Sequence, residues 1–313
     1  MSPQLSTAAA ALVSRFRRQR PLRGGSLLVT IFGDSIAPRG GAIMLGSLIE
    51  LTAPFGLNER LVRTAMARLA DEGWVDNRRL GRLSEYRLSL AGRERFATAT
   101  QQIYGVPGQP WTGLWTALLL PTNRRGAKAT REAARDALAW AGFGEVSAGL
   151  FLHPALPSAE LEQLLAGTAA LSQAILFTTA SASPHSSQRL AALGWDLGEL
   201  ANRYRRFVVQ FSPALEALDR REAPAPLPSF LLRTLLIHEY RKIHLRDPLL
   251  PAGLLPEAWV GADAYRLCRA IYARLAPVAE AHLDSSAASL AGSLPAATAE
   301  FWGRFGGLKE TSR

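Results

Sequence analysis

The stretch NERLVRTAMARLADEGWVDNRRLGRLSEYRLSL, residues 58–90, contains the clearest structural pattern of the chain. Its first half predicts an amphipathic helix, because an apolar stripe and a polar face alternate with helical spacing. The apolar stripe comprises Leu61, Val62, Ala65, Met66 and Leu69. The opposite face comprises Arg60, Arg63, Thr64, Ala67 and Arg68. One face is therefore suited to a core, and the other is free to contact a partner.

Both ends of this helix are marked in the sequence. Asn58 is a good N-cap, and Glu59 suits the positive end of the helix dipole. Gly73 supplies the left-handed conformation that commonly ends a helix.

A β-hairpin is predicted directly after Gly73. A first strand contains Trp74 and Val75, and the second strand alternates apolar with polar residues up to Leu90. The turn between them carries Arg78, Arg79, Gly81 and Arg82. The hairpin therefore has a basic tip.

Two shorter helices precede this stretch, one around Leu27–Phe32 and one around Leu45–Ile49, and a glycine turn at Gly56 leads into the third helix. Three helices followed by a hairpin predict a winged helix-turn-helix, in which arginine side chains read guanine edges or contact phosphates. The alternative is an ordinary solvated helix face. The residues expected to contact DNA are Arg39, Asn58, Arg60, Arg63, Thr64, Arg68, Arg78, Arg79 and Arg82.

Length and composition indicate a multidomain protein. The chain has 313 residues, of which 48% are hydrophobic, and its formal net charge is +10. Residues 1–25 contain five arginines and no acidic residue, which predicts a basic disordered arm. The single cysteine, Cys268, excludes an intrachain disulfide and suits a reducing cytoplasm. No apolar run is long enough to span a bilayer, so a cytoplasmic protein without a membrane partner is expected.

Changes in pattern divide the chain into four parts. After the arm, residues 26–104 form the winged helix-turn-helix domain. Residues 105–222 alternate strands and helices, with strands at 114–120, 146–152 and 175–179, which predicts a ferredoxin-like α+β domain followed by a long helix. Residues 223–313 form a helical C-terminal domain after a proline-rich linker. The expected fold class is thus multidomain α+β.

No catalytic constellation is visible in the sequence. His238, Glu239 and His244 resemble a zinc-protease helix, but the histidines are six residues apart and do not share a helical face. Phosphate-binding loops, dinucleotide fingerprints and nucleophile elbows are absent. A protein that is not an enzyme, and that has no cofactor or bound metal, is expected.

Three segments resemble the PaaX family of transcriptional repressors. They are SLLVTIFGDSIAPRGG (26–41), RTAMARLADEGW (63–74) and HEYRKIHLRDPLLPAGLLPEAWVG (238–261), and the most specific part is 247–261. The resemblance covers nearly the whole chain from Ser26. The family often has W-D-G-x-W where this chain has Trp111-Thr112-Gly113-Leu114-Trp115, and this departure leaves the inducer open.

The resemblance implies a homodimeric repressor of an aromatic catabolic operon, of the phenylacetate type, that an aryl-CoA thioester such as phenylacetyl-CoA releases from double-stranded operator DNA. Such an effector needs an apolar slot and cations for its phosphates. Candidate contacts in the C-terminal part are Tyr240, Arg241, Arg246, Trp259 and Tyr265. For these residues the alternatives are a place in the core and a local ion pair between Arg246 and Asp247.

A second hypothesis is a nucleic-acid-processing protein that uses a Cas2-like middle domain. Such an enzyme needs an acidic metal ligand at the end of the first strand of that domain. The strand here runs into Pro121-Thr122-Asn123, which argues against cleavage. An architectural DNA-binding protein without an effector would leave the large C-terminal half unexplained.

Overall fold

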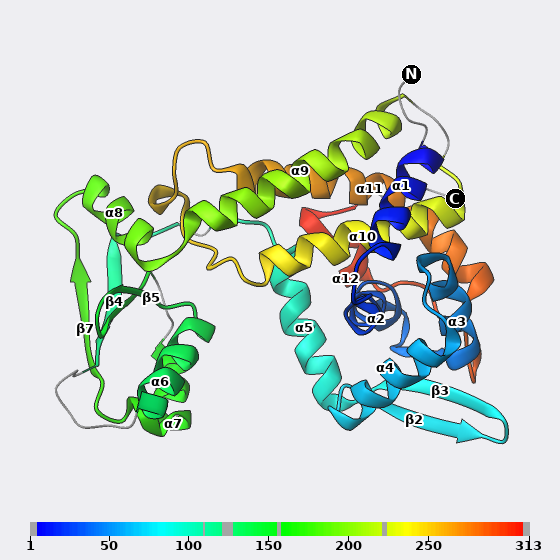
Figure 1. Cartoon of the computed structure of the whole chain (residues 1–313), viewed down its shortest axis with the longest axis horizontal. Coiled ribbons are helices and arrows are strands. Elements are labelled where there is room, and N and C mark those ends of the chain that lie inside the picture. The colour runs from blue at the N-terminus through cyan, green and yellow to red at the C-terminus, as the bar shows by residue number, and fades with distance from the viewer. Residues whose placement is uncertain (1–4, 109, 121–127, 155–157, 221–223, 309–313) are drawn as a thin grey trace. The chain divides into compact units, whose positions relative to one another are not determined.

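The computed structural model describes residues 5–108, 110–120, 128–154, 158–220 and 224–308, with mixed helices and sheets (Figure 1). The chain divides into two units. The first unit combines residues 1–106, 204–245 and 261–313, and the middle unit combines 107–203 with 246–260. The predicted C-terminal part is therefore not a separate compact unit, because most of it shares a core with the N-terminal part and residues 246–260 belong to the middle unit.

The N-terminal part of the first unit is mainly helical, with one small sheet. Its helices are α1 (Leu5–Arg17), α2 (Gly24–Ile31), the π-helix η1 (Phe32–Ile36), η2 (Ala37–Arg39), α3 (Leu45–Thr52), η3 (Ala53–Phe55), α4 (Glu59–Asp71) and α5 (Leu90–Tyr104). Strands β1 (Ala42–Met44), β2 (Val75–Leu80) and β3 (Leu83–Leu88) form an antiparallel sheet in the order β1-β3-β2.

The predicted ends of the helix after Asn58 are confirmed. The Asn58 side chain accepts a hydrogen bond from the Leu61 amide at 2.9 Å, and Gly73 has a φ of 72° just beyond the helix. The hairpin is longer than expected, because Val75–Leu80 pairs with Leu83–Leu88 in full register. Arg78 and Arg79 therefore lie in strand β2, and only Gly81 and Arg82 form the turn.

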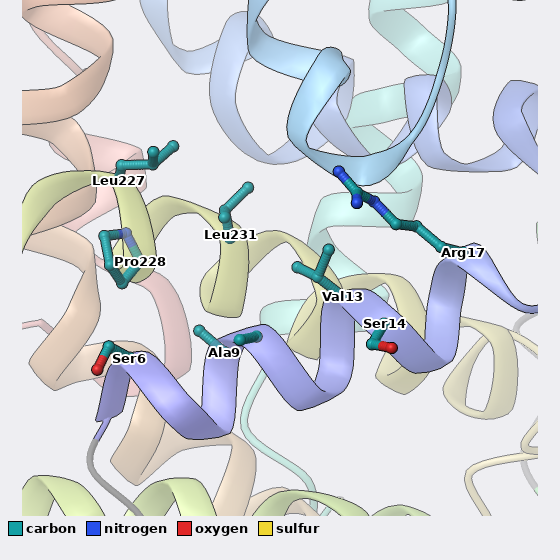
Figure 2. A pocket seen from close by; sticks show the side chains of 9 residues that line it. Ser6, Ala9, Val13, Ser14, Arg17, Leu227, Pro228 and Leu231 are labelled. Atoms are coloured by element: carbon teal, nitrogen blue, oxygen red, sulfur yellow. The ribbon is translucent and has the colours of Figure 1, made fainter.

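The prediction of a disordered arm is wrong, because α1 is part of the core of the first unit. It buries Leu5, Ala8, Leu12 and Phe16, and these positions repeat with helical spacing. Figure 2 shows α1 lying along the start of α10 (Pro226–His244). Residues of both helices line a hollow of about 310 Å³. The arginines dominate the sequence pattern, and the apolar stripe beneath them decides the structure.

The C-terminal part completes the first unit. Its elements are α9 (Leu197–Asp219), which begins in the middle unit, α10, α11 (Val260–Ser286), α12 (Ala299–Trp302), η6 (Arg304–Gly306) and the short strands β8 (Ala288–Ser289) and β9 (Gly292–Ser293). Aromatic contacts join this part to the N-terminal helices: Phe55 meets Phe230 with ring centroids 6.2 Å apart, and Tyr104 meets Tyr272 at 5.7 Å.

A buried network of charged and hydroxyl groups, which we call the Asp34 network, also links these segments. Asp34 in the π-helix accepts hydrogen bonds from the hydroxyls of Tyr104 (2.7 Å) and Tyr272 (2.8 Å). It also forms ion pairs with Arg233 at 3.0 Å and with Arg304 at 3.1 Å. Burial, followed by the Asp34 charge, raises the pKa of Tyr104, which keeps its hydroxyl a donor.

Glu280 on α11 extends the Asp34 network. It pairs with Arg233 at 2.6 Å and with Arg39 at 2.8 Å, and Arg39 also pairs with Asp284. Arginine suits such sites because its planar guanidinium offers several fixed donors to carboxylates. Buried charges are tolerated only when they are paired, so these residues constrain the helices that carry them to one arrangement.

The middle unit has the predicted ferredoxin-like order of elements. Its elements are β4 (Leu114–Leu119), α6 (Lys128–Trp140), β5 (Gly144–Ser147), β6 (Leu150–His153), α7 (Ser158–Gly167), η4 (Ala169–Leu171), β7 (Ile175–Ala180) and α8 (Pro184–Gly194). The sheet is antiparallel in the order β5-β6-β4-β7. The single strand expected at 146–152 is in fact two strands, because Gly149 with a φ of 79° turns the chain between them.

Two apolar clusters cover the faces of this sheet. Leu118 on β4 packs with Leu138 of α6 on one face, and Trp115 of β4 packs with Ala191 of α8 on the other. Leu250 and Leu254 join the Trp115 cluster, and η5 (Ala252–Leu254) carries the second of them. The proline-punctuated segment 246–260 therefore completes the core of the middle unit.

We expect the stability of the middle unit to depend on pH because of His153 on β6. Burial lowers the pKa of His153 to about 4 from the usual 6.5, so the unfolded chain binds a proton that the folded chain does not. The free energy of unfolding should therefore fall as the pH drops from about 6.5 towards about 4. Urea unfolding at about pH 7 and about pH 5 checks this. His153→Phe should flatten the dependence, whereas the exposed His185→Phe should preserve it.

Candidate nucleic-acid interface

The polar face of α4 is open to solvent. Arg60, Arg63, Thr64 and Arg68 are exposed, while Val62 and Met66 are fully buried on the opposite side. The predicted division of this helix into a core face and a free face is confirmed.

Two arginines on this face form exposed ion pairs with nearby glutamates. Arg63 pairs with Glu59 at 2.7 Å and Arg68 with Glu72 at 2.6 Å, each one helical turn away. The side chains of Arg63 and Arg68 are 56% and 81% exposed, so water screens both pairs. Either guanidinium can exchange its carboxylate for a phosphate or a base edge at small cost.

A groove of about 700 Å³ runs between α2 and α4. The predicted residues that line it are Asn58, Arg60, Thr64 and Arg68. Its other wall contains Leu22, Gly24 and Gly25, which the sequence analysis missed because it assigned residues 1–25 to a disordered arm. A Cβ at Gly24 would lie 2.2 Å from the terminal Cδ2 of Leu61, so a larger residue there would require the Leu61 side chain to move. The adjacent glycines Gly24 and Gly25 are the sequence feature that could have indicated this wall of the groove.

The β2–β3 hairpin carries the second group of predicted residues. Arg78, Arg79 and Arg82 are all exposed, and Gly81 with a φ of 59° allows the tight turn. Leu80 and Leu83 pair across the strands next to the turn and are 60% and 51% exposed. The tip therefore presents cations around two apolar side chains, an arrangement suited to the sugar-phosphate edge of a nucleic acid.

Arg39 does not belong to this surface, and its prediction as a DNA contact is corrected. It is 2% exposed, and its guanidinium meets Glu280, Asp284 and the carbonyl of Leu294. These partners come from α11 and the segment after it, so no local pattern could have shown that Arg39 is buried.

The candidate effector residues are divided between the two units: three belong to the first unit and two to the middle unit. Tyr240 is fully buried and stacks on His244, with ring centroids 4.8 Å apart. Arg241 donates to the Thr30 hydroxyl at 2.8 Å and to the Ser26 carbonyl at 2.6 Å. Both residues hold the core of the first unit together.

The other three candidates are more accessible. Tyr265 is half-buried, and its ring lies 5.6 Å from that of Phe305. In the middle unit Arg246 is exposed and Trp259 is half-buried. Tyr240 and Arg241 thus have structural contacts in the first unit. The role of Tyr265, Arg246 and Trp259 in sensing an effector stays a prediction.

The histidine pair of α10 has structural partners. His238 Nδ1 lies 3.0 Å from the Thr30 hydroxyl, and His244 Nδ1 lies 3.0 Å from the Tyr204 hydroxyl. Within the described ranges, no group of three or more histidine, cysteine or acidic residues is placed to hold a metal ion.

Among the helices of the described ranges, none has the length and apolar character needed to cross a bilayer. Pro121, Thr122 and Asn123, which bear on the Cas2-like hypothesis, lie outside the described residues.

Comparisons with known proteins match three consecutive family models. Residues 23–92 match the PaaX-like protein model, 108–191 the PaaX protein central Cas2-like domain, and 195–285 the PaaX-like protein C-terminal domain. The chain is 37% identical to the Transcriptional repressor PaaX of Escherichia coli (strain K12) over 292 residues, which cover 92% of each chain. It is also similar to the solved structure of the Uncharacterized protein Rv0674 from Mycobacterium tuberculosis, with a TM-score of 0.51 and 25% identity over 76% of this chain and 90% of that one. The chain therefore belongs to the family of PaaX-like proteins.

Proposed function

We propose that the protein is a DNA-binding transcriptional repressor and not an enzyme. Helices α2, α3 and α4 act as a helix-turn-helix, and the β2–β3 hairpin acts as its wing. The observation that carries the proposal is the exposed face of α4, where Arg60, Arg63 and Arg68 stand clear of the core. The similarity to the repressor from Escherichia coli supports the same role.

The two basic elements have different tasks in this proposal. A helix in the major groove can place arginine side chains against guanine edges, which carry sequence information. Arginines on the wing meet phosphates or the minor groove, where contacts position the protein on any sequence. Arg63 on α4 and Arg79 on β2 represent the two tasks.

We further propose that the repressor is a cytoplasmic homodimer that controls an aromatic catabolic operon of the phenylacetate type. An aryl-CoA thioester, with phenylacetyl-CoA as the first candidate, is its inducer. The inducer acts by shifting the population towards a dimer in which the two α4 helices no longer match the operator half-sites. This part rests on the family resemblance.

A gel shift and a thermal-shift screen test the two parts separately. The full chain should retard a duplex from the promoter of an aromatic catabolic operon more strongly than a scrambled duplex. Phenylacetyl-CoA should raise the melting temperature and release the duplex, whereas free CoA should do neither. Operator binding without any response to aryl-CoA esters would support the proposal of a repressor and contradict the proposed inducer.

Arg63→Ala is expected to remove selectivity for the operator, whereas Arg79→Ala should weaken binding to every duplex alike. Loss of a base-reading arginine costs about 1 to 3 kcal/mol on the specific site only. Gel shifts on operator and scrambled duplexes measure both effects. Arg266→Ala is the matched control, because Arg266 lies on α11 and forms an exposed pair with Asp263. Equal losses on both duplexes for Arg63→Ala would show that Arg63 does not read bases.

A further inference from the structure

The end of the β2–β3 hairpin carries two leucines outside the core. Strand β1 pairs with β3 no further than Glu85, so residues 77–84 continue beyond β1 as a two-stranded ribbon (Figure 1). Leu80 and Leu83 lie opposite each other at its end and are joined by a two-residue turn. They are 60% and 51% exposed. The ribbon therefore ends in an apolar pair that contacts solvent.

Positive charge surrounds this apolar pair. Arg78, Arg79 and Arg82 are exposed, and residues 77–84 contain no aspartate or glutamate. The next acid on β3, Glu85, is fully buried and forms an ion pair at 3.3 Å with an arginine of the same strand. A neutral apolar partner gains nothing from three arginines, whereas a polyanion is attracted to them before any apolar contact forms. The end of the hairpin is therefore complementary in charge to a nucleic acid.

The two faces of the ribbon have different side chains. Successive residues of a strand point to opposite faces, so the leucine pair shares one face with Arg78, whereas Asn77 and Arg79 lie on the other. On this second face the Ser84 hydroxyl donates to the Asn77 side-chain oxygen at 2.7 Å across the two strands. Backbone pairing continues without a bulge as far as the leucine pair. The leucines are thus held at the end of a regular ribbon, with cations on both faces.

The minor groove of a DNA duplex suits such a tip. Phosphates line both of its sides, and the edges of stacked base pairs form its floor. A leucine can enter between two neighbouring base pairs, unstack them and kink the duplex toward the major groove. Burial of the leucines offsets part of the free energy that unstacking costs. Such a wedge needs apolar side chains at the end of a slender element and cations beside them, and the β2–β3 hairpin has both.

We propose that Leu80 and Leu83 enter the minor groove beside the major-groove site of α4, unstack one base step and bend the operator. Arg78, Arg79 and Arg82 then contact the phosphates on the two sides of the opened groove. The inference rests on the DNA-binding function proposed above and adds a second way of choosing the operator. Pyrimidine–purine steps unstack more easily than others, so the wing would favour operators with such a step without hydrogen-bonding to a base.

Gel mobility of the full chain on circularly permuted duplexes measures the bend. The duplexes have equal length and carry the retarded promoter segment at different positions, and the mobility of a bent complex depends on that position. We expect a bend of about 20° or more for the wild type. The double variant Leu80→Thr/Leu83→Thr should remove the bend and weaken operator binding by about tenfold, since threonine favours the strand but is a poor wedge.

Two controls separate the wedge from a loss of folding. Leu80→Met/Leu83→Met keeps two apolar side chains and should bend the duplex like the wild type. Leu193→Thr removes a leucine that is 65% exposed on α8, outside the proposed interface, and should also leave the bend unchanged. The adenine analogue 2-aminopurine, placed at successive positions of the duplex, brightens where a base step is unstacked. We expect a bright position with the wild type and the methionine variant but not with the threonine variant.

The possible failures of the two proposals are distinguishable. A duplex that is retarded but stays straight, or that the threonine variant bends as strongly as the wild type, would overturn the wedge and leave the proposal of a repressor intact. Loss of the bend in the methionine variant would overturn it too. If the threonine variant bent DNA normally but sedimented differently without DNA, the leucines would belong to a protein contact instead. A chain that retards no duplex would overturn both proposals.

Discussion

Replacing Arg233 with methionine is expected to lower the free energy of unfolding of the first unit by about 3 to 5 kcal/mol. Arg233 is completely buried and pairs with Asp34 at 3.0 Å and with Glu280 at 2.6 Å. It also donates to the Ser35 hydroxyl at 2.9 Å. Methionine fills similar space but leaves two carboxylates in the core without their shared cation. Asp34 keeps Arg304 and Glu280 keeps Arg39, but the buried network loses one of its cations, and breaking a buried pair costs more than the loss of a surface ion pair.

Urea unfolding followed by far-ultraviolet circular dichroism measures this loss. Arg266→Met is the matched control, since the Arg266 side chain is 71% exposed and pairs with its helical neighbour Asp263. The control should change the free energy of unfolding by less than about 1 kcal/mol. Similar small changes in both variants would mean that the Asp34 network does not contribute to the stability of the first unit.

A chain that ends after Asp219 is expected to lose operator binding completely and to lose the cooperative unfolding of its N-terminal helices. This truncation removes α10 and α11, and with them Arg233 and Glu280 of the Asp34 network. It also removes Phe230 and Tyr272, the aromatic partners of Phe55 and Tyr104. Asp34 would then be left beside apolar surface that has lost its cover, so the α2–α4 segment cannot reach its folded geometry.

Gel shifts and thermal melts of the two truncated forms decide this point. A chain that ends after Leu308 is the control, because it retains all the contacts just described and should bind and melt like the full chain. If the chain ending after Asp219 melted cooperatively and still bound its operator, the N-terminal helices would be an independent domain. That result would restore the division into separate DNA-binding and C-terminal domains which the sequence predicts.

Local sequence pattern is sufficient to determine several elements of the fold. The helix from Glu59 to Asp71 follows from its apolar stripe, its Asn58 cap and Gly73, all of which act within a few residues. The ferredoxin-like order of the middle unit follows from alternating strand and helix periods. The exposed arginines of α4 follow from the same periodicity, because a face opposite a core stripe is left to solvent. Helix α1 has an equally regular apolar spacing, but the arginines around it obscure that pattern.

Only the tertiary structure decided which arginines are free and which are buried. Arg39 and Arg63 look alike in sequence, but Arg39 meets Glu280, 241 residues further along the chain, whereas Arg63 meets Glu59 one turn away. The segment 246–260 likewise lies in sequence between two helices of the first unit and yet packs through Leu250 and Leu254 on Trp115. Periodicity reports which face of an element is apolar but carries no information about the distant surface that will cover it. The sequence therefore determined the elements and their exposed faces, and long-range packing decided that the N-terminal and C-terminal helices share one core.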